Sequence, residues 1–291
     1  MKGLLMAGGT GSRLAPMTKV VSKHLLPVYD KPMIYYPLTT LMLCGVREIL
    51  IICNSRDTAD YQALLGDGSL WGCAFSYAVQ DGAGGIAEAY RIGETFVRDE
   101  TSALILGDNI FYGDRLGSVF ADAVSLNRGA TIFAHHVNRP EDYGVVEFDG
   151  DKSILSIEEK PTNPRSNWAV TGLYVYDAEV VDIVRGLQRS ERGELEVTDI
   201  NRAYLELGRL NVKRIGRGYA WLDAGTPDGL LEASEFVRTV ERRQGYKIAC
   251  PEEVAYQMGY IGADALGRLA HEHGGSAYGN YLFNVIAEVR G

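Results

Sequence analysis

The first half of the chain alternates short apolar runs with segments of helical periodicity. Residues 3–7 form an apolar run that ends in glycines, which indicates a buried strand entering a loop. Residues 34–43 carry apolar side chains at helical spacing, and Gly45 follows them as a helix C-terminal glycine. Strands alternating with helices are typical of βαβ units, so we expect a parallel sheet covered on both faces. The same patterns predict strands over residues 48–53, 75–79 and 103–106, and helices over residues 58–65 and 86–97.

The order of predicted elements changes after residue 130, where strands follow one another with few helices between them. This pattern favours antiparallel additions to the sheet. We therefore predict an α/β fold: a Rossmann-like, mixed but mostly parallel sheet flanked by helices, with antiparallel additions and a C-terminal helical appendage. The expected division is a core over residues 1–230 and a helical segment over residues 231–291 that docks on it. The predicted elements are strands 131–137, 144–148, 154–158, 170–176, 211–215 and 219–222, and helices 200–207, 232–243, 251–258 and 278–289.

Composition narrows the classes of function. The chain has 29 Lys and Arg against 38 Asp and Glu, a net charge of −9, so nucleic acid and anionic membranes are poor partners. No apolar stretch approaches the ~18 residues of a membrane span. The four cysteines form no C-x-x-C pair and two lie in apolar runs, which indicates buried, reduced thiols. We therefore expect a cytoplasmic protein that acts on small molecules.

A glycine-rich segment follows the first predicted strand. It contains Gly8, Gly9, Gly11 and Arg13, a pattern in which backbone N–H groups and a guanidinium can surround a phosphate. The dinucleotide fingerprint G-x-G-x-x-G fails because its last position is Leu14, and the P-loop pattern has no match. The segment is therefore a phosphate loop of another kind or a tight turn.

Three further polar residues lie where a phosphate site would need them. Lys23 supplies a compact positive charge after the glycine-rich segment, although a lysine there is also typical of a solvated surface. Asp108 and Asp223 each end a short apolar strand, and carboxylates at strand ends can converge at the carboxyl edge of an α/β sheet. Oxygen ligands beside phosphates indicate Mg²⁺, whereas either aspartate alone is also typical of a cap or turn.

The order and spacing of these residues resemble the signature of the sugar nucleotidyltransferases. Residues 6–14, Pro16, Lys23 and residues 27–33 carry the start of that signature. Because the matching segments follow in the same order through nearly the whole chain, they are more specific than any single motif. The similarity is to the glucose-1-phosphate thymidylyltransferases within the family, and it continues at residues 64–68, 106–113, 143–148, 158–161, 171–174, 192–196, 221–226, 243–245 and 250–253.

The resemblance implies transfer of a thymidylyl group from dTTP to α-D-glucose 1-phosphate, giving dTDP-glucose and pyrophosphate for deoxysugar biosynthesis, such as that of dTDP-rhamnose. It implies Arg13 and Lys23 as catalytic residues, Mg²⁺ held by Asp108 and Asp223, and a homotetramer that can carry a second nucleotide site. The implied nucleotide-binding residues are Gly8, Gly9, Gly11, Arg13, Gln80 and Gly85, the last two facing the thymine. The implied sugar-phosphate-binding residues are Asn109, Gly144, Glu159, Lys160, Val170, Tyr174 and Arg192.

Two places depart from the pattern of that family. His24 follows Lys23, where the family usually has glutamine. The stretch from Gln80 to Ala89 lacks two prolines that are usual there, and Glu88 replaces a glutamine. These changes bear on the choice of nucleotide and sugar, and they leave the proposed catalytic and metal-binding residues unchanged.

Several alternatives remain open from the sequence. The first is the same chemistry with UTP or another sugar phosphate, such as that of an amino sugar. A non-catalytic subunit that senses sugar nucleotides is a second, and the presence of all four charged site residues argues against it. An NAD-dependent enzyme is opposed by the failed fingerprint. His135-His136 and His271-Glu272-His273 lack a third ligand at zinc spacing, so we expect structural or surface histidines.

Overall fold

A mixed sheet forms the centre of the molecule. The computed structural model of the protein describes residues 1–125, 128–150 and 153–290. The main path of the sheet has the strand order β10-β9-β11-β6-β1-β4-β5, and β8 pairs with both β11 and β12. The strands of this sheet are β1 Lys2–Ala7, β4 Glu48–Cys53, β5 Ala74–Val79, β6 Ser102–Leu106, β8 Ala130–His136, β9 Gly144–Asp149, β10 Ser153–Glu159, β11 Trp168–Tyr176 and β12 Leu210–Ile215.

One half of the sheet is parallel and supplies a common carboxyl edge. β1 pairs in parallel with β4 and β6, and β4 pairs in parallel with β5. The register places Met6 beside Leu106 and Ala7 beside Cys53, so these strands end side by side. The loops that follow β1, β5 and β6 therefore emerge next to one another, as expected for an α/β sheet.

The other half of the sheet is mostly antiparallel, which confirms the expected additions, although β12 pairs with β8 in parallel. β11 runs antiparallel to β6, β8 and β9, and β10 returns against β9. The pairing of β11 with β8 shifts between Val170 and Tyr174. An irregularity of this kind bends a strand, and here it lies in the stretch that borders the site described below.

A small second sheet brings two distant aspartates together. β7 (Asn109–Gly113) pairs antiparallel with β13 (Tyr219–Asp223), and the register places Asp223 opposite Asn109. The backbone N–H of Ala224 donates to the carbonyl oxygen of Asp108 at 3.0 Å. The sequence did not predict β7, because its five residues follow β6 after a turn of only two residues.

Helices cover both faces of the sheet, as predicted. Leu5 faces one core, which α1, α2, α5 and α9 help to close, whereas Leu4 and Met6 face a second core with α3, α6 and α7. This alternation along β1 is the two-residue period of a strand buried on both sides. These helices are α1 Tyr35–Leu43, α2 Thr58–Leu65, α3 Glu88–Ile92, α4 Glu94–Val97, α5 Leu116–Ser125, α6 Val180–Gly186 and α7 Val197–Glu206.

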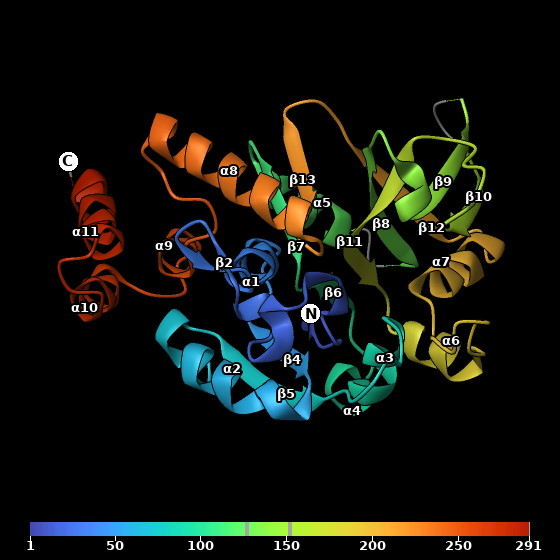
Figure 1. Ribbon diagram of the computed structural model, residues 1–291, viewed down its shortest axis with the longest axis horizontal. Coiled ribbons are helices and arrows are strands. Elements are labelled where there is room, and N and C mark those ends of the chain that lie inside the picture. Colours follow the sequence, from blue (N-terminus) through green and yellow to red (C-terminus); the bar gives the residue numbers. More distant parts are fainter. Residues whose placement is uncertain (126–127, 151–152, 291) are drawn as a thin grey trace.

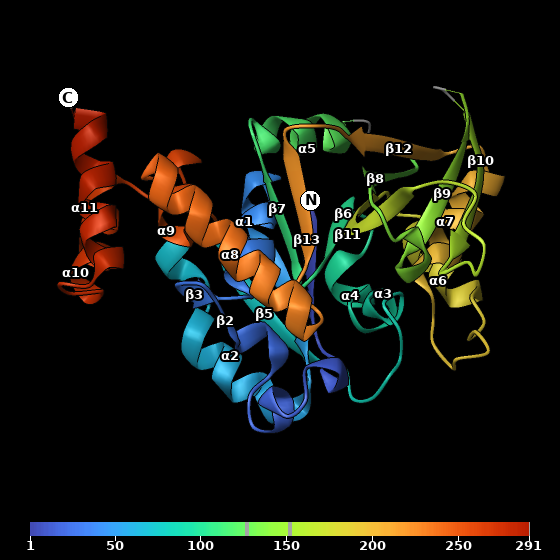
Figure 2. The same ribbon diagram turned by 45° about the horizontal axis from the view of Figure 1, so that its top comes forward.

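The C-terminal part is helical, and its last two helices extend away from the sheet. Figures 1 and 2 show α10 and α11 at one end of the molecule and the β9–β10 hairpin with α6 and α7 at the other. The boundary expected at residues 230 and 231 lies within α8, and the division into two domains stays a prediction. The C-terminal helices are α8 Pro227–Gln244, α9 Pro251–Gln257, α10 Ala263–Glu272 and α11 Ala277–Arg290.

Some predicted bounds were wrong in detail. The helix expected over residues 86–97 is two short helices that break at Gly93, which packs against Leu4 so closely that a Cβ would lie 3.0 Å from it. The helix expected from residue 200 begins at Val197, and α8 begins at Pro227, where Thr226 accepts a capping hydrogen bond from the Gly229 N–H. The short helices α5 and α6 were not predicted from the sequence.

Candidate active site

Two adjoining cavities open at the carboxyl edge of the parallel strands. We call the first the loop cavity; it measures about 320 Å³ and is lined by the glycine-rich segment and the segment after β5. We call the second the inner cavity; it measures about 160 Å³ and lies between β6, β9, β11 and the β7–β13 pair. The residues that line both cavities are Arg13, Ile86, Leu106 and Asp108. A molecule that occupies both cavities would therefore pass Arg13 and Asp108.

The glycine-rich segment leaves β1 and forms one wall of the loop cavity. Gly9 has φ +90° and open space where a side chain would be, so its backbone can approach a ligand. Gly11 has φ +60° and does not line the cavity; its carbonyl accepts from the Thr18 hydroxyl at 2.8 Å, which closes the turn. Leu14 is fully buried and anchors the segment, while Arg13 stays exposed at the border of the two cavities.

Lys23 and Asp108 form the central ion pair of the site. The Lys23 Nζ lies 2.5 Å from Asp108 Oδ2, and both side chains are mostly buried. Burial opposes ionisation of Asp108, but the Lys23 ammonium holds the pKa of this carboxyl well below its usual range. His24 is buried beside them, and burial together with the charge of Lys23 lowers its pKa to about 3. The imidazole is therefore neutral at physiological pH, and its Nδ1 lies 3.2 Å from the Tyr61 hydroxyl.

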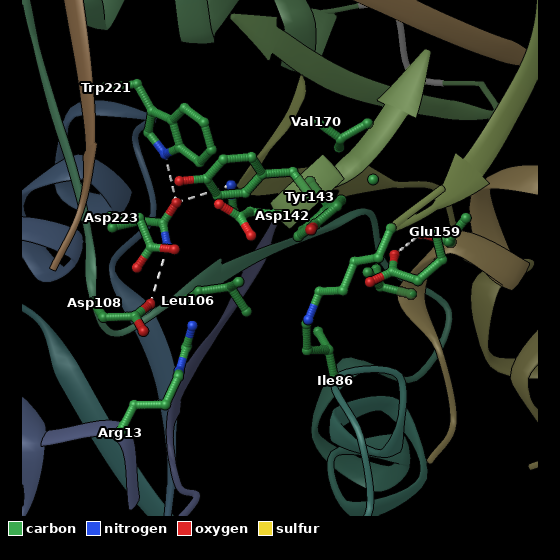
Figure 3. A pocket seen from close by; sticks show the side chains of 17 residues that line it. Arg13, Ile86, Leu106, Asp108, Asp142, Tyr143, Glu159, Val170, Trp221 and Asp223 are labelled. Carbon is green, nitrogen blue, oxygen red and sulfur yellow. Dashed lines mark hydrogen bonds between the residues drawn. The ribbon is translucent and has the colours of Figure 1, made fainter. Parts of the chain in front are cut away.

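Asp108, Asp223 and Arg13 converge on one point. A Cβ placed on Gly225 would lie 2.8 Å from Asp223 Oδ1, 2.9 Å from Arg13 Nη2 and 3.1 Å from Asp108 Oδ2. Figure 3 shows the three side chains on the same side of the inner cavity, with Glu159 on the opposite side. Burial, reinforced by the negative charge of Asp108, raises the pKa of Asp223 above its usual value. A cation bound between the two carboxylates would favour the ionised form of Asp223.

The far wall of the inner cavity carries a fixed carboxylate. Glu159 Oε2 accepts a hydrogen bond of 2.5 Å from the Thr198 hydroxyl, and its Oε1 lies 3.6 Å from Arg192 Nη2. Arg192 does not itself line the cavity, because its guanidinium also donates to Glu196 Oε1 at 2.9 Å. Lys160 does line the cavity, with a positive φ of 43° at the end of β10.

Asn109 is buried and already bonded on both ends of its amide. Its Nδ2 donates to Asp108 Oδ1 at 2.9 Å, while its Oδ1 accepts from the Gly172 N–H at 3.0 Å and from Trp221 Nε1 at 2.5 Å. Asn109 thus connects the β6–β7 turn with β11 and β13. This geometry suits a residue that positions Asp108, and it leaves little capacity for a direct bond to a sugar phosphate.

Most of the predicted site residues do come together. The loop cavity gathers Gly8, Gly9, Arg13, Lys23, Gln80 and Gly85, and the inner cavity gathers Asn109, Gly144, Glu159, Lys160, Val170, Tyr174 and Asp223. Gly11 and Arg192 line neither cavity; Gly11 bonds to Thr18, and Arg192 pairs with Glu159. Sequence reasoning assigned no role to Tyr143, Thr198 and Trp221, which also line the inner cavity. Tyr143 and Trp221 lie in segments that resemble the family, so the sequence could have indicated both. Thr198 lies outside these segments.

Three further observations concern the cysteines, the helices and a histidine outside the two cavities. All four cysteines are buried free thiols, as predicted. Across the part of the chain that the structure describes, no helix combines the length and apolar character needed to cross a bilayer. His135 lies near Trp221, and its Nδ1 is 3.2 Å from the carbonyl oxygen of Ile215, which is a structural contact.

Comparison with known proteins agrees with this geometry. The family described as nucleotidyl transferase matches residues 2–240. The glucose-1-phosphate thymidylyltransferase of Xanthomonas campestris pv. campestris is 53% identical over 97% of this chain and 95% of its own length. The glucose-1-phosphate thymidylyltransferase of Mycobacterium tuberculosis is 52% identical over 98% of this chain and 99% of its own. A crystal structure from Bacillus anthracis, assigned as a glucose-1-phosphate thymidylyltransferase and solved with sucrose, is 44% identical and superimposes with a TM-score of 0.76, covering 82% of this chain and 95% of that one.

Proposed function

This chain belongs to the nucleotidyl transferase family, and we propose that it transfers a thymidylyl group from dTTP to α-D-glucose 1-phosphate. In this reaction a phosphate oxygen of the sugar phosphate attacks the α-phosphorus of dTTP. The new P–O bond forms as the bond to the bridging oxygen breaks, and pyrophosphate leaves. The observation that carries the proposal is the meeting of Arg13, Lys23, Asp108 and Asp223 where the two cavities join.

The two cavities suit the two substrates. The loop cavity, with its exposed glycine backbone and Arg13, would hold the triphosphate and base of dTTP. The inner cavity, with Glu159 and Lys160, would hold the sugar hydroxyls and the sugar phosphate. Such a transfer depends on positioning and charge neutralisation more than on a protein nucleophile. Lys23 would stabilise charge at the α-phosphate, and Arg13 would stabilise the leaving pyrophosphate.

The carboxylates fit a magnesium ion. Asp108 and Asp223 approach the same point, and Asp223 forms no ion pair within 4.0 Å with a described residue. Within residues 1–125, 128–150 and 153–290, no third carboxylate, histidine or cysteine joins them in a metal-binding group. Magnesium commonly binds to one or two protein carboxylates and completes its shell with phosphate oxygens and water. When bound, the ion would offset the charge of the reacting phosphates.

The base side of the loop cavity suits thymine or uracil. Gln80 Nε2 donates to the Gly85 carbonyl at 3.0 Å, while no described residue donates a hydrogen bond to Gln80 Oε1. This oxygen can accept the N3–H of thymine or uracil. The two bases share this edge, so the choice between them depends on one methyl and the 2′-hydroxyl, and a methyl contributes only about 1–3 kcal/mol. We therefore expect dTTP to be preferred modestly over UTP, and ATP and GTP to be poor substrates.

A comparison of kcat/KM for dTTP, UTP, ATP and GTP, each with glucose 1-phosphate, tests the proposal. The same series with galactose 1-phosphate and glucosamine 1-phosphate tests the choice of sugar. A clear preference for a purine nucleotide, or for another sugar phosphate, would contradict the assignment of substrates and leave the nucleotidyl transfer itself intact. Absence of pyrophosphate release with every pair would favour the sensor alternative.

We further propose that the enzyme is a cytoplasmic homo-oligomer, of which a tetramer is the form that the resemblance implies. Its four free thiols suit a reducing compartment. Sedimentation equilibrium over a range of protein concentrations measures the assembly, and a monomer at all concentrations would contradict it.

A further inference from the structure

The Glu88 side chain joins the base side of the loop cavity to a second loop, and the roles proposed above do not use it. Its Oε2 accepts a hydrogen bond from Gln80 Nε2 at 2.8 Å. Its Oε1 accepts one from Arg189 Nη2 at 2.9 Å, which is also an ion pair.

The bridge determines which end of the Gln80 amide faces the cavity. Gln80 Nε2 donates to two acceptors, the Glu88 carboxylate and the carbonyl oxygen of Gly85. A carboxylate cannot donate, so only the nitrogen end of the amide can satisfy this side. The oxygen end must then point the other way, and a Cβ on Gly8 would lie 3.1 Å from Gln80 Oε1. The carbonyl oxygen is thus directed toward the glycine-rich wall of the cavity.

The ion pair with Arg189 holds the Glu88 carboxylate, and through it the Gln80 amide, more firmly than a hydrogen bond between neutral groups would. Its guanidinium also donates to the carbonyl oxygens of Gly193 at 2.8 Å and Gly84 at 3.3 Å, so it spans the segment after β5 and the loop after α6. Charge-assisted hydrogen bonds of this kind are stronger than neutral ones. The positive charge holds the carboxylate in place. Both loops border the base side of the cavity, so the bridge also limits their movement.

We propose that Glu88 is a positioning residue that directs the Gln80 carbonyl oxygen toward the base and so selects bases that carry an N–H group at that point. Thymine and uracil carry an N3–H there, whereas the N3 of cytosine is an acceptor and would face another acceptor. This inference rests on the proposed function, because it takes the loop cavity as the base site. It adds a determinant of base choice that does not itself touch the nucleotide.

The decisive variant is Glu88→Gln, which changes one charged acceptor into an amide of the same shape. The single carbonyl oxygen of the new amide can bond either Arg189 or Gln80, and the charged Arg189 is the stronger donor. Its NH₂ group then faces Gln80, which is driven to turn its own nitrogen toward the base. We expect the ratio of kcat/KM for dTTP over dCTP to fall about tenfold, mostly through a higher KM for dTTP. The KM for glucose 1-phosphate should stay within twofold.

A second substitution should reverse the effect. In Glu88→Gln with Arg189→Ala, the competing donor is gone, so the carbonyl of the new amide is free to accept from Gln80 again. The dTTP over dCTP ratio should therefore recover toward that of the parent protein. A role of Glu88 in loop stability alone predicts the opposite, because losing both residues would loosen the loops further. The matched control is Glu94→Gln, which removes a carboxylate that pairs with Arg185 on the same side of the molecule and does not contact Gln80.

Equilibrium binding of dTTP and dCTP, measured by calorimetry without the sugar phosphate, separates this inference from the proposed function. If the parent protein binds dTTP over dCTP and Glu88→Gln lowers that preference, the inference holds even if no thymidylyl transfer is found. It is overturned if the preference of Glu88→Gln stays within twofold of the parent, if Glu94→Gln lowers it equally, or if the double variant fails to recover. Equal binding of dTTP and dCTP by the parent would also overturn it.

Discussion

Two clusters of charged side chains, one between the β2–β3 hairpin and α8 and one at the junction of the two cavities, differ in how completely their charges are paired. In the first, Lys31 bonds to Asp30 at 2.5 Å and to Glu241 at 2.9 Å, and Lys247 bonds to the same two carboxylates. The Ile248 N–H also donates to Glu241 at 2.9 Å. Each of these four charged groups thus has opposite charges on two sides, and the cluster fastens α8 and the segment that follows it to the β2–β3 hairpin (Pro27–Val28 and Lys31–Pro32).

The active-site cluster has the same composition, two cations and two carboxylates, but it is incomplete. Lys23 and Asp108 pair closely, whereas Arg13 and Asp223 have no ion pair within 4.0 Å among the described residues. Burial and the nearby charge of Asp108 also raise the pKa of Asp223. A closed network stabilises the fold, whereas the open one leaves charged groups for the phosphate and metal of the proposed function. The comparison therefore separates a structural cluster from a functional one by the number of unpaired charges rather than by burial.

The largest expected effect is on the closed cluster. Lys31→Met removes a buried cation and leaves two carboxylates with one lysine, which should lower the free energy of unfolding by about 3 kcal/mol. Urea unfolding followed by circular dichroism measures the change. Lys2→Met is the control, since Lys2 forms ion pairs with the exposed carboxylates of Glu48 and Glu100 and should cost less than about 1 kcal/mol. Equal destabilisation by the two variants would contradict the distinction.

In contrast to Lys31→Met, Lys23→Ala should affect the rate of the reaction more than the stability of the fold. Loss of charge at the α-phosphate should lower kcat by about 10²-fold or more, with the protein still folded. Pyrophosphate release at saturating substrates gives kcat, and circular dichroism checks folding. Lys19→Ala is the matched control, because Lys19 is an exposed lysine nearby that lines neither cavity. A Lys23→Ala enzyme with near-normal kcat would remove this residue from the mechanism.

Asp223→Asn tests whether Asp223 of the open cluster is a ligand of the proposed Mg²⁺. The amide removes one negative charge, so the Mg²⁺ concentration at half-maximal rate should rise by about tenfold, and EDTA should abolish activity of the parent. A titration of rate against Mg²⁺ measures this. Asp228→Asn, at an exposed position in the first turn of α8, should leave the titration unchanged. Saturation of Asp223→Asn at the Mg²⁺ concentration of the parent would exclude this aspartate as a ligand.

The smallest effect concerns a third charge pair, which adjoins the closed cluster: the Tyr278 ring contacts His273, and Lys247 Nζ lies 5.5 Å from the centroid of the same ring. His273 Nε2 lies 3.5 Å from the buried carboxylate of Glu252, and this contact raises the pKa of His273 above its usual value of about 6.5. A raised folded-state pKa stabilises the protein below the unfolded pKa, and this stability is lost as pH rises through the folded value. Because His273 is partly exposed, the contribution should be a few tenths of a kcal/mol.

His273→Gln should therefore lower the melting temperature slightly at pH 6 and not at pH 8.5. Differential scanning calorimetry at the two pH values measures the difference. The variant His271→Gln changes a neighbouring histidine of α10 that forms no ion pair with Glu252, and it should show no such pH dependence. A loss for His273→Gln that is the same at both pH values would mean that the side chain acts by packing against Tyr278 instead.

The sequence predicted the position of a residue well where that residue follows a regular element. Gly8, Gly9 and Arg13 follow a strongly apolar strand, and Asp108 follows another, so their place at the carboxyl edge could be stated in advance. It predicted the role of a residue less well where the side chain bonds to other residues of the protein rather than to a ligand. Asn109 was expected to bind the sugar phosphate, yet its amide is bonded to Asp108, Gly172 and Trp221. These hydrogen-bond partners come from the β6–β7 turn, β11 and β13, and no local pattern of residues brings them together.

The sequence by itself determined the class of fold, the family and the set of charged groups available for the reaction. These follow from local periodicity and from short motifs, because strand ends, turns and glycines act over a few residues. Only the tertiary structure decided which charges are left unpaired. Asp108 and Asp223 are 115 positions apart in number, 223 − 108, and they meet because β7 pairs with β13 in one register. Glu88 and Arg189 likewise meet only because the loop after α6 returns to the segment after β5. Such pairings depend on packing across the whole chain, which no local pattern of residues encodes.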